Sequence, residues 1–223
     1  MRRVFDFEGP VFSFLSRLAD LFWLNLLFIL CCIPVITVGA ASTALYYVTL
    51  KMAKDEEGYI TKSFFKSFKY NLIQATVIWI LFLVIAAVML MDLRIANGGN
   101  VVDFFNDPSV SNIVIVAVGV MCIVLLMTLT YVFPLLAQFD NTVKNTVKNA
   151  FLISIRHLPY TFLMILISFV PVALIWFSPA LFILVLIMFS LTAYINSKFL
   201  NKIFVLYMPD KDAQTEDADP AEV

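Results

Sequence analysis

The sequence predicts an all-α fold, a polytopic bundle of transmembrane helices. Of its 223 residues, 62% are hydrophobic and only 14% are charged, and the mean hydropathy is +0.94. Soluble domains average roughly 45–50% apolar and about 25% charged residues. One soluble core could not bury so large an apolar excess, because the folded chain must still present a polar surface to water. The long apolar runs therefore indicate helices that lie in lipid.

The first apolar run extends from Leu18 to Leu50 and is interrupted near its middle. A helix that crosses the hydrocarbon needs about 20 apolar residues, so this run is too long for one crossing. Pro34 cannot donate to the carbonyl of residue 30, and Gly39 permits close contacts that larger residues prevent. The run is therefore either one kinked crossing or two crossings joined by a sharp turn.

The distribution of Lys and Arg favours two crossings. The chain then has six spans, and fourteen of its 15 Lys and Arg residues lie on one side. With one crossing it has five spans, and eleven of the 15 lie on that side. The positive-inside rule therefore favours six spans with both termini in the cytoplasm. The objection is length, because Val35 to Leu50 gives about 24 Å of helix for ~30 Å of hydrocarbon. With five spans this arm is an interfacial or partly embedded helix.

Two basic amphipathic segments are predicted as short helices on the cytoplasmic surface. The first lies within Lys51–Tyr70, where lysines alternate with phenylalanines at helical spacing. The second lies within Ala137–Leu158 and carries basic residues that point to the same side of the membrane. Such segments anchor a helix at the membrane surface, and they can also bind a partner or an anionic lipid headgroup. The candidate docking surface consists of Lys62, Lys66, Lys69, Lys144, Lys148 and Arg156.

The rest of the chain completes one membrane domain. Further spans are expected at Asn71–Met91, Val110–Leu136, Tyr160–Phe177 and Ala180–Asn196. Residues 1–208 are predicted to form a single integral membrane domain. Residues 209–223 are acidic and lack periodicity, so they are predicted to be a disordered tail.

Five positions are candidates for a helix break or a polar group inside the membrane: Asn25, Pro34, Thr37, Gly39 and Pro134. Two interpretations of Pro34–Gly39 are open. In the first, the stretch is an architectural turn that packs small residues closely. In the second, the freed carbonyls near Leu30 and the Thr37 hydroxyl belong to a polar site at the centre of the bundle.

The sequence predicts neither an enzyme nor a cofactor or metal site. It contains no H-E-x-x-H, G-x-S-x-G or P-loop motif and no paired carboxylates inside a span. A net charge of −1 argues against a nucleic-acid partner, because there is no basic excess to displace counterions. No charged residue lies in the middle of a span, which argues against ion-coupled transport.

Several stretches resemble the YesL-like family of bacterial integral membrane proteins, which carry a domain of unknown function. They are Leu24–Leu27, Ile33–Ala41, Ala44–Tyr47, the Phe65–Asn71 approach, Phe133–Leu136 and Asn149–Pro159. The spacing Pro34-x-x-Thr37-x-Gly39 is the most specific part. The resemblance implies a protein of the bacterial plasma membrane that is associated with carbohydrate uptake or polysaccharide utilisation. It supplies no catalytic residue.

Two functions are therefore expected from different classes. The first is an accessory protein that works in the lipid bilayer beside sugar ABC-transporter subunits. The second is a small sugar transporter or facilitator, in which polar side chains and aromatic rings line the path. The row of small residues Ala40–Ala44 can pack within one chain or between two, so a homo-oligomer is also an open alternative.

Overall fold

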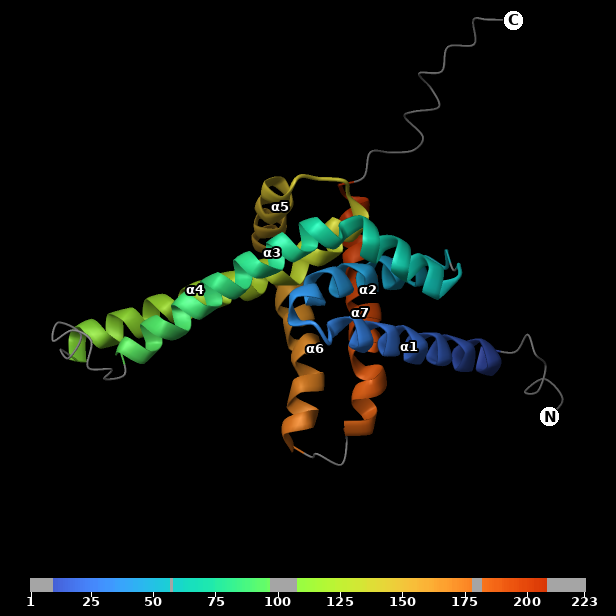
Figure 1. The fold of residues 1–223 in the computed structure, drawn as a ribbon, viewed down its shortest axis with the longest axis horizontal. Helices are drawn as coiled ribbons and strands as arrows, with labels where there is room; N and C mark the ends of the chain where they lie inside the picture. Colours follow the sequence, from blue (N-terminus) through green and yellow to red (C-terminus); the bar gives the residue numbers. More distant parts are fainter. Residues whose placement is uncertain (1–9, 57, 97–107, 178–181, 208–223) are drawn as a thin grey trace, which may run out of the picture.

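Figure 1 shows a computed structural model of the chain, which describes residues 10–56, 58–96, 108–177 and 182–207. The described residues form α1 (Pro10–Cys32), the 3₁₀ turn η2 (Val35–Thr37), α2 (Val38–Met52), α3 (Ile60–Ala96), α4 (Pro108–Gln138), α5 (Val143–Arg156), α6 (Leu158–Phe177) and α7 (Phe182–Val205). No strand occurs in these ranges, and the predicted all-α fold class is confirmed. The predicted acidic tail, residues 209–223, lies outside the described residues.

The break in the first apolar run reverses the direction of the chain. The α1 helix ends at Cys32, and α2 begins at Val38 after the short turn η2. Pro34 adopts an extended conformation (φ −75°, ψ 114°) and cannot continue the hydrogen bonding of α1. In Figure 1, α2 runs back along α1, and the two helices pack against each other. The predicted sharp turn is therefore confirmed.

The first basic segment is not a separate helix, which corrects the prediction. The α3 helix begins at Ile60 and continues without a break to Ala96. Lys62, Lys66 and Lys69 therefore lie on the first turns of the same helix that forms the next apolar stretch. The physical reason is that no Pro or Gly occurs between Ile60 and Ala96, so nothing interrupts the helical hydrogen bonds.

The second basic segment does form its own helix, as predicted. The α5 helix covers the 14 residues Val143–Arg156, and the next residue, His157, leaves the helical region of the backbone (φ −116°, ψ 43°). The chain bends by 104° between α5 and the first part of α6. This bend turns α6 away from the direction of α3 and α4. In Figure 1, α6 and α7 lie side by side and run across α1–α4.

The α2 helix lies at the centre of the protein. Of its candidate membrane stretch, 56% is buried, against 11–22% for the other candidate spans. Its apolar side chains contribute to two cores, one with α3–α7 around Tyr131 and Phe204, and one with α1, α3 and α7 around Leu24 and Phe64. Ala40, Ala41 and Ala44 are fully buried. The small-residue row therefore packs within one chain, and a homo-oligomer stays a prediction.

Four stretches of the described residues are long and apolar enough to span a membrane: Leu15–Cys32, Val35–Met52, Ile60–Ile95 and Ser111–Gln138. The bent pair α5–α6 is a fifth if it counts as one span. Large apolar side chains are exposed along α3 and α4, such as Val84, Leu90 and Val116. So much exposed apolar surface is stable in lipid and not in water. The chain is therefore an integral membrane protein, whereas the count of six spans stays a prediction.

The turn between α1 and α2 is exposed and apolar. Ile33, Val35 and Ile36 expose 75%, 62% and 59% of their surface, and Pro34 is exposed beside them. A turn that emerges into water is usually rich in polar residues. The composition of this turn instead suits a position inside the hydrocarbon.

The lengths of the two arms agree with this position. No charge occurs between Asp20 and Lys51, so each arm has about 20 Å of uncharged helix, against ~30 Å of hydrocarbon. The turn contacts α3 at Trp79, near the middle of the uncharged stretch between Lys69 and Asp92. We therefore expect the α1–α2 hairpin to enter and leave the bilayer on the same side, and to turn near its middle.

Cysteine accessibility tests this expectation. In a chain whose Cys31, Cys32 and Cys122 are replaced by alanine, we expect Val35→Cys to resist a membrane-impermeant maleimide on both sides of intact membranes. It should react after denaturation in detergent. Lys54→Cys and Arg94→Cys are the matched controls, and they should react from opposite sides. Labelling of Val35→Cys from the side of Arg94→Cys would instead establish two complete crossings.

Candidate functional site

Several backbone groups at the turn around Pro34 are hydrogen-bonded within the turn. The Thr37 N–H donates to the carbonyl of Pro34 (3.0 Å), and the Ile33 N–H donates to that of Leu30 (3.5 Å). The Thr37 hydroxyl lies 2.7 Å from the carbonyl oxygen of Cys31 and 2.8 Å from that of Pro34. The Leu30 carbonyl and the Thr37 hydroxyl are thus engaged within the turn. These contacts support the architectural interpretation and leave neither group free for a polar site at the bundle centre.

The turn is fixed to α3 by one hydrogen bond and one close contact. The indole Nε1–H of Trp79 donates to the carbonyl of Val35 at 2.8 Å. A Cβ added at Gly39 would lie 2.5 Å from the carbonyl oxygen of Ala75 and 2.8 Å from the Cβ of Trp79. Only glycine therefore allows α2 to approach α3 so closely, as the architectural interpretation of Gly39 requires.

Asn25 joins α1 to α7 in the buried interior. Its side chain is 0% exposed, and its Oδ1 accepts a hydrogen bond from the backbone N–H of Ser190 (3.1 Å). The Ser190 hydroxyl donates back to the carbonyl of Leu21 at 2.6 Å. The structure thus places Asn25 as a buried polar group, as predicted, and shows that it holds two helices together.

Further polar side chains of α7 bind α2 and α6. Ser197 and Thr49 share a hydrogen bond between their hydroxyls (2.8 Å). The amide of Asn201 donates to the carbonyl of Leu50 at 3.2 Å, and that of Asn196 donates to the Ser168 hydroxyl at 3.0 Å. In lipid, where apolar burial does not drive association, such bonds stabilise helix pairs by about 0.6–2 kcal/mol each. We call Ser190, Asn196, Ser197 and Asn201 the α7 polar row.

Pro134 lies inside α4 and does not end it. The helix continues to Gln138, and Pro134 is buried. One turn earlier, the buried Tyr131 hydroxyl shares a 3.0 Å hydrogen bond with the hydroxyl of Thr161 in α6. The candidate positions are therefore not gathered into one site. Asn25 belongs to the α1–α7 contact, Gly39 to α2–α3, and Pro134 to the part of α4 that faces α6.

All six residues of the candidate docking surface are exposed. Lys62, Lys66 and Lys69 lie on the initial turns of α3. The other three, Lys144, Lys148 and Arg156, lie along α5. The two groups are connected where the Tyr70 hydroxyl donates to the Asp140 carboxylate (3.2 Å), immediately before α5. Within the described residues the one ion pair is Arg17–Asp55, so none of these six cations is neutralised by a carboxylate.

The sequence analysis missed three residues that make the long-range contacts. Trp79 and Ser190 supply the partners for Val35 and Asn25, and Tyr207 contacts the α5–α6 bend through a 3.2 Å hydrogen bond to His157. Trp79 carried a usable signal, because tryptophans of membrane proteins favour the interfaces and one in mid-span needs an acceptor. No comparable signal marked Ser190 or Tyr207. In the described ranges no three His, Cys, Asp or Glu residues are grouped to hold a metal.

Taken together, the fold and these contacts define a helical integral membrane protein with a basic edge at one end. The family described as a protein of unknown function, DUF624, matches residues 21–93. This is about a third of the chain, and it covers the turn, α2 and most of α3. No curated protein and no solved structure matches the chain.

The contact at Gly39 leads to a prediction with a matched control. Gly39→Ala should lower the free energy of unfolding by about 1–3 kcal/mol, because the added methyl group overlaps the backbone of α3. Gly119→Ala places a methyl group where no atom lies within 4 Å. It should leave stability unchanged or raise it by about 0.5–1 kcal/mol, since alanine favours helix. Thermal unfolding of the purified variants measures both, and equal effects would contradict the close contact.

Thr37 gives a second prediction about stability. Thr37→Val keeps the shape of the side chain but removes its hydrogen bonds to the turn, which should cost about 1–3 kcal/mol of stability. Thr37→Ser keeps the hydroxyl and should retain most of the stability of the parent. Urea or thermal unfolding in detergent compares the three proteins. If valine and serine behave alike, the hydroxyl does not stabilise the turn.

Proposed function

We propose that this protein is an accessory subunit in the bacterial plasma membrane, which works beside the subunits of a sugar ABC transporter. It has no catalytic role in this proposal. The resemblance to YesL-like proteins supports the association with carbohydrate uptake. The observation that carries the proposal is the state of the six candidate docking residues, which are all exposed and form no ion pair among the described residues.

Helix topology supports a common side for the two basic groups. The α3 and α4 helices pack against each other and run in opposite directions in Figure 1. The start of α3 and the end of α4 therefore face the same side, and α5 follows directly after α4. Because basic residues concentrate on the cytoplasmic side, this side is assigned to the cytoplasm in our proposal.

Free cations on this side favour an acidic partner. Complementary charge on two proteins accelerates their association and selects the correct partner, whereas like charges facing each other cost several kcal/mol. A cytoplasmic subunit with an acidic face would meet Lys144 and Lys148 on α5, and Lys62 and Lys66 on α3. The apolar faces of α3 and α4 remain available to lipid or to a transmembrane subunit.

Recovery of the tagged protein from its native membrane in mild detergent tests the proposal. Mass spectrometry should find sugar-transporter subunits in amounts close to those of the protein itself. The double variant Lys144→Glu/Lys148→Glu should recover at least about tenfold less of them, the equivalent of ~1.4 kcal/mol of binding free energy. Arg94→Glu, at the opposite end of α3, is the matched control and should recover as much as the parent. A protein recovered alone, or paired only with itself, would contradict the proposal.

A second function, a small sugar facilitator, is favoured by one observation. Asn196 is fully buried in the α7 polar row, and its Oδ1 has no hydrogen-bond partner in the described residues. Such an acceptor could bind a sugar hydroxyl within the membrane. Uptake of a panel of sugars into vesicles that contain the purified protein separates the two functions. Uptake faster than into empty vesicles, and lost in Asn196→Leu, would support the facilitator.

A further inference from the structure

A pocket of about 400 Å³ lies where the end of α4, the helix α5 and the residues just after α7 meet. Its polar lining consists of Asn141, Asn149, Arg156 and Tyr207. Its apolar part includes the buried Leu135 of α4. Among the described residues that line it there is no Asp or Glu. The pocket therefore combines one cation with neutral polar groups.

Arg156 is held at the pocket by Tyr207. The guanidinium carbon lies 5.9 Å from the centre of the Tyr207 ring, and both residues belong to the lining. The Tyr207 hydroxyl in turn shares a 3.2 Å hydrogen bond with Nε2 of His157. Contact with an aromatic ring leaves the N–H donors of a guanidinium able to bind an anion. Arg156 makes no ion pair or hydrogen bond within the described ranges, so these donors are available.

Two amide side chains add to these donors. Asn149 lies on α5, two turns before Arg156, and Asn141 lies in the segment between α4 and α5. Both are half-buried, and neither side chain makes a hydrogen bond in the part of the chain that the structure describes. Polar groups that are shielded from water without a partner cost free energy. A ligand with phosphate oxygens and hydroxyl groups would supply partners for both amides and for Arg156.

The carboxylate closest in sequence does not neutralise this pocket. Asp140 precedes Asn141, but it is not part of the lining. It accepts a hydrogen bond from the Tyr70 hydroxyl at 3.2 Å. The positive charge of Arg156 is therefore retained, and a ligand that brings a second cation to the pocket would be repelled.

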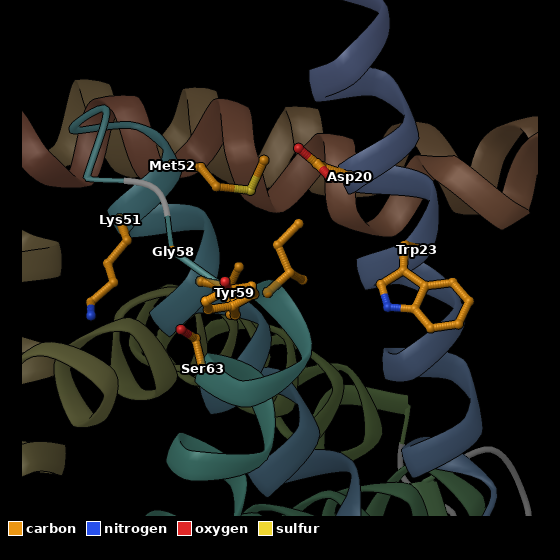
Figure 2. A pocket seen from close by; sticks show the side chains of 9 residues that line it. Asp20, Trp23, Lys51, Met52, Gly58, Tyr59 and Ser63 are labelled. Atoms are coloured by element: carbon orange, nitrogen blue, oxygen red, sulfur yellow. The ribbon is translucent and has the colours of Figure 1, made fainter.

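A second pocket, between α1, the end of α2 and the start of α3, is less suited to an anion (Figure 2). Its lining contains both Asp20 and Lys51, which lie on either side of the segment at Gly58 and Tyr59. Asp20 would repel an anion that entered on its side of this segment. The pocket beside Arg156 has no such charge among its described lining residues.

The position of the pocket indicates where an anion comes from. No charged residue occurs between Arg156 and Lys198 or within α4, so the pocket lies where apolar helices reach the headgroups. The α5 helix also exposes Leu152 and Ile155, by 52% and 47%, and Leu152 lines the pocket. At a membrane surface, the apolar side chains of such an amphipathic helix contact acyl chains. The anion that reaches this pocket is therefore expected to belong to a lipid.

We propose that this pocket binds the headgroup of an anionic phospholipid, as in phosphatidylglycerol. The phosphate accepts hydrogen bonds from Arg156 and Asn149, and the glycerol hydroxyls bond to the amide of Asn141, which can donate and accept. The acyl chains follow the apolar surface beside Leu152. Phosphatidylethanolamine and phosphatidylcholine fit less well, because each brings a cation close to Arg156 and no carboxylate of the described lining receives it. Basic pockets beside membrane helices are suited to such headgroups. The site does not depend on the proposed protein partner.

Native mass spectrometry of the purified full chain measures this preference directly. Dioleoyl phosphatidylglycerol should bind at least about tenfold more tightly than the phosphatidylethanolamine or phosphatidylcholine with the same chains. Free glycerol phosphate should bind at least about tenfold more weakly than the lipid, because it gains nothing from the apolar surface. If it binds as tightly as the lipid, the source is a soluble phosphate and the lipid assignment is overturned. Equal binding of the three lipids would also overturn it.

Variants of α5 separate the pocket from the general charge of this helix. Arg156→Gln and Asn149→Leu should each weaken binding of phosphatidylglycerol by about tenfold or more, because each removes hydrogen bonds to the phosphate. Lys148→Gln removes the same charge from an exposed residue of α5 outside the lining, and it should bind as the parent does. If Lys148→Gln weakens binding as much as Arg156→Gln, the lipid responds to the charge of α5 as a whole, and the proposal is overturned. If Arg156→Gln does not fold, Asn149→Leu decides the outcome, and unchanged binding in a folded variant of either residue would overturn the proposal.

Discussion

The break between α1 and α2 leaves backbone groups without helical partners among exposed apolar side chains. In the middle of the bilayer, where we expect this turn to lie, no water would satisfy them. The Thr37 hydroxyl and the Trp79 indole supply hydrogen bonds to this turn. Trp79 reaches Val35 because Gly39 lets α2 lie against the backbone of α3. Since α2 is the most buried of the four candidate membrane stretches and belongs to both apolar cores, this contact helps to determine where α1, α4 and α7 pack.

The α7 polar row complements this contact at the other side of α2. Apolar packing in lipid is weakly directional, and hydrogen bonds between helices fix their relative rotation. The bonds of Ser190 to α1, Ser197 to α2 and Asn196 to α6 each require one rotation of α7. The α7 helix contributes to both apolar cores, and its rotation in them is therefore set by its polar side chains. Within this row, the Oδ1 of Asn196 is also the one atom that favours a facilitator.

Local chemistry made part of this arrangement predictable. Pro34 and Gly39 are enough to predict a break in the helix and a close approach of helices, because proline removes a helical hydrogen bond and glycine leaves room for a neighbouring backbone. The prediction of a separate helix at Lys62–Lys69 was wrong. The sequence changes there from amphipathic to wholly apolar, but such a change does not end a helix that contains no Gly or Pro. The partners of Asn25 and Trp79 were out of reach, since they lie 165 and 44 positions away in the sequence and depend on the tertiary fold.

The two ends of the α1–α2 hairpin differ chemically, and this difference bears on function. The exposed side chains of the turn are the apolar ones of Ile33, Pro34, Val35 and Ile36, and the Thr37 hydroxyl is bonded within the turn, so these groups suit lipid better than a soluble partner. The opposite end collects Asp20, Lys51, the Arg17–Asp55 pair and the start of α3 with its lysines. This end of the hairpin therefore adjoins the docking surface, because Lys62 and Lys66 are exposed on the first turns of α3, and the proposed partner would meet the end at which charge is concentrated.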